Sequence, residues 1–122
     1  MNHYLKCAVV ALALGSAGHA WAECAAPEAP TMPDGGSATM DDMLAGQKAV
    51  KAYQAANLEY MNCLEPMIEA ATAKARGESA TEEDMAAAKA LEEKFNAAVS
   101  AEEDVAGQFN TEIREYKAAN PG

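Results

Sequence analysis

Two long helix-forming segments, separated by one short break, constrain the fold of this chain more than any other feature. The break is Arg-Gly-Glu-Ser-Ala at 76–80, where Gly77 suits the C-terminal end of one helix and Thr81 the N-cap of the next. The flanking segments, 39–75 and 81–118, are rich in alanine and other strong helix formers. Because so short a link favours helices packed side by side, we predict an all-α, antiparallel two-helix hairpin.

Apolar residues recur along both segments at spacings of three and four, so each predicted helix carries one apolar stripe. The first stripe runs Met43, Gly46, Val50, Tyr53, Asn57, Tyr60, Leu64, Met67 and Ala71. The second runs Ala88, Leu91, Phe95, Ala98, Glu102, Val105, Phe109, Ile113 and Tyr116. Four further apolar residues fall off the first stripe: Leu44, Leu58, Met61 and Ile68. We therefore expect the first helix to be covered on more than one side, and dimerisation to a four-helix bundle is one way to cover it.

Two details of the helices bear on packing. Pro66 lacks a backbone N–H, which predicts a kink in the first helix just before it. Asn57 and Glu102 interrupt the stripes near the middle of the hairpin, close to Tyr53. They form either a buried polar layer that fixes the register of the helices, or, if the register is shifted by one position, a pair in which Glu102 is solvated.

The N-terminal residues 1–22 have the pattern of a cleavable signal peptide. One cation, Lys6, precedes an apolar run of about a dozen residues, which is too short to cross a bilayer. Ala20-Trp21-Ala22 then supplies the small-x-small pattern of a cleavage site, so we predict cleavage after Ala22. Glu23 and Trp21 stand where lipoprotein processing needs other residues, so Cys24 is not expected to carry a lipid. The predicted location is the periplasm or the outside of the cell.

Cys24 and Cys63 are the cysteines that remain after this cleavage. In an oxidising compartment they predict one disulfide, which would close a loop of about 40 residues and stabilise the fold by roughly 4 kcal/mol. An intermolecular bridge is the alternative. A zinc site is disfavoured because it needs four ligands, typically Cys or His, and both histidines, His3 and His19, lie in the predicted signal peptide.

Residues 23–38 form a predicted extended arm. Pro27, Pro30 and Pro33 recur at every third position, as in polyproline II, and the Pro-Asp-Gly-Gly sequence at 33–36 predicts a turn. A Cys24–Cys63 bridge would fold this arm back along the outer side of the first helix. There we expect it to cover some of the apolar residues that lie off the stripe.

The sequence offers little for catalysis. The predicted mature chain has no histidine, and it lacks an EF-hand loop and a glycine-rich phosphate loop, so we predict no enzyme and no cofactor. Met40 and Met43 are three residues apart and their thioethers suit Cu(I), which makes soft-metal binding an alternative function. The formal net charge of −10 disfavours nucleic acid and anionic membrane surfaces as partners.

Several motifs resemble a group of small exported proteins of Gram-negative bacteria. They are the Cys-x2-Pro-x2-Pro-x2-Pro-Asp-Gly arm at 24–35, Val-Lys-Ala-Tyr at 50–53, Tyr-Met-Asn-Cys-Leu at 60–64 and Gln-Phe-Asn-Thr-Glu-Ile-Arg-Glu-Tyr-Lys at 108–117. The resemblance implies export and a helical hairpin, and it implies no activity. Periplasmic stress chaperones of the Spy type are also small and helical, and a chaperone-like role is a second alternative, although their Leu-Thr-x-x-Gln signature does not occur here.

These observations predict a small, acidic, non-enzymatic protein of the cell envelope. We expect it to act through contacts with another envelope protein or with itself, since two helices bury only a modest core. No insertion into the membrane is expected once the signal peptide is removed.

Overall fold

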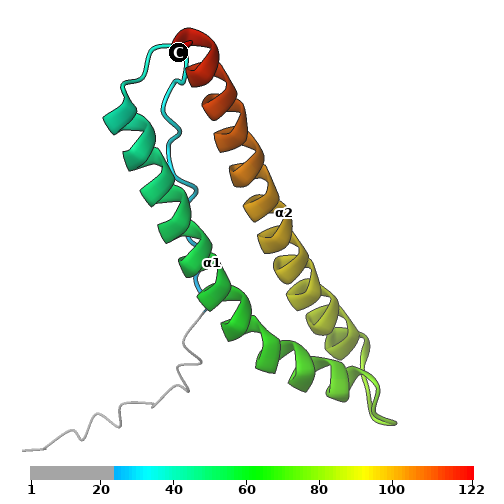
Figure 1. Cartoon of the computed structure of the whole chain (residues 1–122). Helices are drawn as coiled ribbons and strands as arrows, with labels where there is room; N and C mark the ends of the chain where they lie inside the picture. The colour runs from blue at the N-terminus through cyan, green and yellow to red at the C-terminus, as the bar shows by residue number, and fades with distance from the viewer. Residues whose placement is uncertain (1–23) are drawn as a thin grey trace, which may run out of the picture.

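The computed structural model describes residues 24–122, in which the chain forms two long antiparallel helices and no strand (Figure 1). Helix α1 spans Met40–Ala75 and helix α2 spans Glu82–Ala119. The prediction of an all-α helical hairpin is confirmed, and both helices begin and end within one residue of the expected ranges. The predicted signal peptide and its cleavage site lie outside the described residues.

Both helices begin with the same capping arrangement. The backbone N–H of Asp42 donates to the hydroxyl of Thr39 at 3.1 Å, and the N–H of Thr39 donates to the carboxylate of Asp42 at 2.9 Å. Thr81 and Asp84 repeat this pair at the start of α2, at 3.2 and 3.0 Å. The hydrogen bond from the Thr39 N–H lowers the pKa of Asp42, and the bond from the Thr81 N–H lowers the pKa of Asp84.

The link between the helices departs from the expectation for Gly77. Arg76 is the C-cap of α1 with right-handed helical angles, and Gly77 follows it without the left-handed conformation common at this position. The N–H of Gly77 instead donates to the carbonyl of Lys74 at 3.2 Å. The side chain of Lys74 also reaches across to Asp84 at 3.1 Å, so the link is closed by contacts from both helices.

Pro66 lies inside α1, which remains helical on both sides of it. Figure 1 shows α1 bending in its second half, the segment that leads to the link. Loss of the hydrogen bond that a residue with an N–H would make at this position accounts for such a bend.

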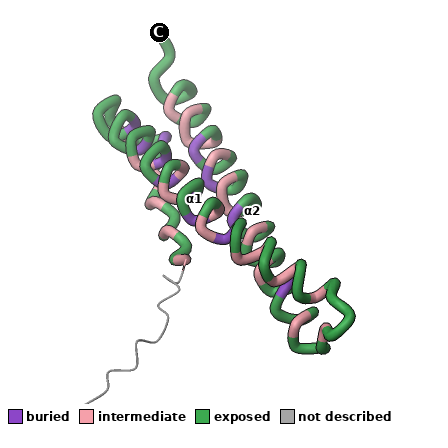
Figure 2. Tube along the Cα trace, turned by 90° about the horizontal axis from the view of Figure 1, so that it is seen from below, coloured by how far each residue is buried: buried purple, intermediate pink, exposed green. Residues whose placement is uncertain are grey.

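Two apolar clusters lie between the helices, along the line of buried positions seen in Figure 2. The cluster nearer the C-terminus contains Met43, Val50, Tyr53, Val105 and Phe109. The cluster nearer the link contains Tyr60, Leu64 and Ala98. Asn57 separates the two clusters and is only 1% exposed.

The arm at 24–39 lies alongside both helices, which corrects the expected position on the outer side of α1 (Figure 1). Met32 and Ala38 pack against the first cluster, to which both helices contribute, and Cys24 packs against the second. Leu44 and Leu58, which the arm was expected to help cover, are 54% and 55% exposed. The arm follows the groove because the core between two helices is incomplete there, and its apolar side chains fill that groove.

Candidate functional site

A disulfide between Cys24 and Cys63 fixes the start of the arm to α1. The Cα atoms of these residues are 5.7 Å apart, and the bridge spans 39 positions of sequence. The sulfur of Cys24 also lies 3.6 Å from the thioether sulfur of Met67, one turn further along α1. The structure therefore joins the two cysteines that the sequence paired, and it places the bridge against the apolar core near the link.

The other end of the arm is fixed by the turn at 34–37. The carboxylate of Asp34 accepts the N–H of Gly36 at 3.0 Å, and its carbonyl accepts the N–H of Ala38 at 2.7 Å. The N–H of Gly35 donates to the carboxylate of Glu112 on α2 at 2.7 Å. Gly35 is buried so closely against α2 that a Cβ there would overlap the backbone of Glu112 and come within 2.9 Å of the Tyr116 nitrogen.

A second glycine permits the arm to approach α1. A Cβ at Gly46 would lie 2.9 Å from the ring of Pro33 and 3.1 Å from the ring of Phe109. Because these distances are shorter than ordinary carbon contacts, the absence of a side chain lets the arm and both helices meet at this point. The arm is thus held by a disulfide at one end and by two close glycine contacts at the other.

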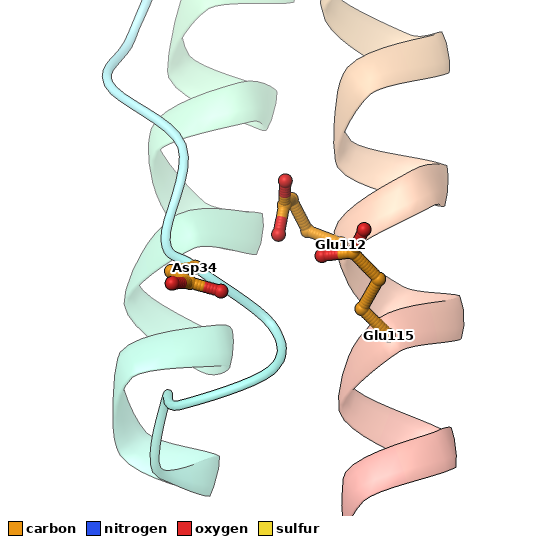
Figure 3. A group of neighbouring side chains, drawn as sticks. All are labelled: Asp34, Glu112 and Glu115. Atoms are coloured by element: carbon orange, nitrogen blue, oxygen red, sulfur yellow. The ribbon is translucent and has the colours of Figure 1, made fainter.

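Three carboxylates meet where the turn reaches α2, as Figure 3 shows. Oxygen atoms of Asp34, Glu112 and Glu115 lie within 4.8 Å of one another. The nearby carboxylate of Glu112 raises the pKa of Glu115. Oxygen ligands of this kind suit Ca²⁺ or Mg²⁺. However, Glu112 already accepts the N–H of Gly35, and Asp34 and Glu115 are exposed, so docking of the turn explains the arrangement.

The structure brings together the two polar residues that interrupt the stripes. The amide of Asn57 donates to the carbonyl of Ala98 at 3.0 Å and to the carboxylate of Glu102 at 3.1 Å. Glu102 is half-buried. Burial of Tyr53 raises the pKa of its hydroxyl, and the nearby charge of Glu102 raises this pKa further. The pair therefore occupies one level of the hairpin, with Glu102 bonded across the seam.

The two methionines of the alternative metal site differ in their surroundings. Met43 is 6% exposed and belongs to the apolar cluster around Phe109, whereas Met40 is 56% exposed. Residues 24–122 contain no histidine that would complete a copper site. Packing in the core accounts for Met43 without a metal.

The helix faces that the arm leaves uncovered carry the large exposed apolar side chains. Leu58 lies five residues before Cys63, about 140° around α1 from the attachment point of the arm. Val99 lies about 160° around α2 from Ala97 and Ala101, which border a hollow beside arm residues. In the described part of the chain, five large apolar side chains are between 39% and 56% exposed: Met40, Leu44, Leu58, Met85 and Val99.

None of these five side chains borders the three hollows that arm residues help to form. We call the surface that contains them the arm-free face. It also includes Met61, Ile68 and Phe95, which are half-buried. Exposed apolar side chains that share one face of two helices can serve as a site of protein contact.

Some features of this site could be predicted from the sequence, and others could not. The disulfide was predictable because only Cys24 and Cys63 follow the predicted signal peptide. The carboxylate group at the turn was missed because Asp34 lies far in sequence from Glu112 and Glu115, and only the position of the arm brings them together. Gly46 stood on the apolar stripe, and a glycine at a core position is a signal of close backbone approach that could have located the arm.

Neither helix of residues 24–122 has a stretch both long and apolar enough to cross a membrane. No protein-family model, curated protein or solved structure matches this chain. Its function must therefore be argued from its own residues.

Proposed function

We propose that this chain is a small exported protein of the bacterial cell envelope that acts without catalysis, by binding protein through its arm-free face. The exposure of Leu58 and Val99, at 55% and 39%, is the observation that carries the proposal. The arm covers the opposite side of the hairpin, so the two sides differ in how much apolar surface they leave to solvent. Apolar surface next to a covered core is stabilised by a partner that removes it from water.

Export is part of the same proposal. A disulfide between Cys24 and Cys63 persists in an oxidising compartment, and the leader pattern before Ala22 directs a chain there. The periplasm and the cell exterior both meet this requirement. In either place the arm stays attached to α1, and the arm-free face remains the side that is open to a partner.

Site-specific photo-crosslinking in living cells tests the proposal. A photoreactive amino acid at Leu58, on the arm-free face, should give protein adducts after irradiation. The matched control is the same amino acid at Glu59, which is also exposed but lies about 100° further around α1. Adducts at Leu58 and not at Glu59 support the proposal. No adduct at Leu58, or equal adducts at both positions, would contradict it.

A further inference from the structure

The arm-free face contains two hollows, one near each end of the hairpin, and no arm residue borders either of them. The link-end hollow, of about 590 Å³, lies between Ile68 of α1 and Phe95 of α2. The open-end hollow, of about 540 Å³, lies near the start of α1 and the end of α2, between Leu44 and Ile113. The two hollows are similar in size and both have apolar side chains in their lining.

The two hollows differ in the sign of their charge. The link-end hollow is bordered by Glu65, Glu69 and Glu92 and by no lysine or arginine. The open-end hollow is bordered by Lys117 and by no aspartate or glutamate. An apolar lining with opposite charges at its two ends makes this face complementary to itself when one copy is reversed.

We propose that a second copy of this chain binds the arm-free face in the antiparallel direction, so that the link-end hollow of each copy lies over the open-end hollow of the other. The inference rests on the proposed function, since it names the partner of the same face. A two-fold axis then passes near Leu58, which is about midway along α1 between the two hollows. Lys117 of each copy lies near the carboxylates of Glu65, Glu69 and Glu92 of the other, as an isologous interface requires.

The size of the face is sufficient for such a dimer. About 30 residues of each helix overlap, which is about 45 Å of length at about 1.5 Å per residue. Two packed helices are about 20 Å wide, so each copy covers roughly 900 Å². Specific interfaces bury about 800 Å² on each partner. Leu58 and Val99, both exposed in the single chain, lie in the middle of this area, where apolar contacts contribute most.

Charge distinguishes this arrangement from its competitors. A parallel dimer would place the three carboxylates of the link-end hollow against their own copies, which is unfavourable. A basic partner would fit the link-end hollow and the net charge of −10, but it would meet Lys117 at the open end. The antiparallel second copy satisfies both hollows at once.

A charge-swap experiment on the purified exported protein tests this arrangement. Sedimentation equilibrium over a range of micromolar concentrations should show a reversible dimer. Lys117→Glu and Glu69→Lys should each weaken the dimer roughly tenfold, because each variant places like charges together. The double variant should dimerise more tightly than Lys117→Glu alone, since the new lysine at position 69 then lies near the new glutamate at position 117 of the other copy. Lys94 borders hollows beside the arm, and Lys94→Glu makes the same change in net charge as Lys117→Glu, so this control should leave the dimer unchanged.

Three results would overturn the inference: a monomer at all concentrations, a dimer insensitive to the single charge changes, or a double variant that dimerises no more tightly than Lys117→Glu alone. Circular dichroism of each variant shows whether the hairpin is intact. The crosslinking at Leu58 distinguishes failure of the dimer inference from failure of the proposed function. An adduct with a different protein, from a chain that is monomeric in solution, would overturn the dimer and retain the contact face, whereas no adduct would overturn the face itself.

Discussion

Replacing Gly46 by alanine tests whether the arm lies in the groove between the helices. The new Cβ would stand 2.9 Å from the ring of Pro33 and 3.1 Å from that of Phe109. Ordinary carbon contacts are about 3.5 Å, so the arm has to move by roughly 0.6 Å. Overpacking of this kind costs about 1–3 kcal/mol, while alanine in place of glycine stabilises a helix by about 0.5–1 kcal/mol.

Gly107 supplies the matched control because it also lies inside a helix, and a Cβ there would meet nothing within 4 Å. Gly107→Ala should therefore raise the free energy of unfolding by about 0.5–1 kcal/mol. Gly46→Ala should fall below Gly107→Ala by about 1–3 kcal/mol in urea unfolding, with equal m-values. In a Pro33→Ala background the difference should shrink, since the ring that is contacted has gone. If Gly46→Ala stabilised the protein as much as Gly107→Ala, the position of the arm would be refuted.

Three further predictions concern the turn, the seam and the acid response. Gly35→Ala should lower the free energy of unfolding by roughly 2–4 kcal/mol in urea unfolding, because the turn must leave α2 and lose a charged hydrogen bond. Gly36→Ala, whose Cβ would meet only a side-chain oxygen at 3.4 Å, should change it little, and equal losses would argue against the docked turn. The double variant Asn57→Leu with Glu102→Leu should be more stable by roughly 1 kcal/mol, since a buried polar pair is replaced by apolar contact. Unchanged stability in the same assay would count against the polar layer. Glu115 has a raised folded-state pKa, so its charge destabilises the fold at neutral pH. Glu115→Gln should therefore raise the melting temperature at neutral pH, and this gain should disappear as the pH falls to the ordinary value of 4.5. A gain that persisted in acid would contradict this cause.

The sequence predicted the parts of the fold that depend on local signals. Thr39 and Thr81 mark the helix starts because a hydroxyl before a run of helix formers is itself the cap, and the structure forms both capping boxes. The meeting of Asn57 and Glu102 was foreseeable for a related reason. Once the link is short, one register parameter fixes every level of the hairpin.

The course of the arm was not predictable in this way. Gly35 belongs to a Pro-Asp-Gly-Gly sequence that favours a turn by itself, and nothing local indicates that its nitrogen reaches Glu112. The same sequence is compatible with an arm on the outer side of α1 or in the groove. The choice depends on packing against two helices at once, through Gly46 and Phe109, which no single segment encodes.

The position of the arm determines which surface remains for function. With the arm in the groove, Leu44 and Leu58, two of the apolar side chains that the sequence placed off the stripe, stay exposed, and they share one face with Val99 and Met85 of α2. The proposed envelope function and the antiparallel dimer both follow from this asymmetry between the two sides of the hairpin. The acidic group at the turn has a role in docking the arm that requires no bound ion.

Intact mass spectrometry of the exported protein, without reduction, is the most direct test of the central claim, which is a covalently attached arm in a protein outside the cytoplasm. We predict a chain that begins at Glu23, is two hydrogen atoms lighter than the dithiol form and reacts with a thiol reagent only after reduction. A native protein whose Cys24 and Cys63 both react before reduction, or whose mass still includes residues 1–22, would contradict the account.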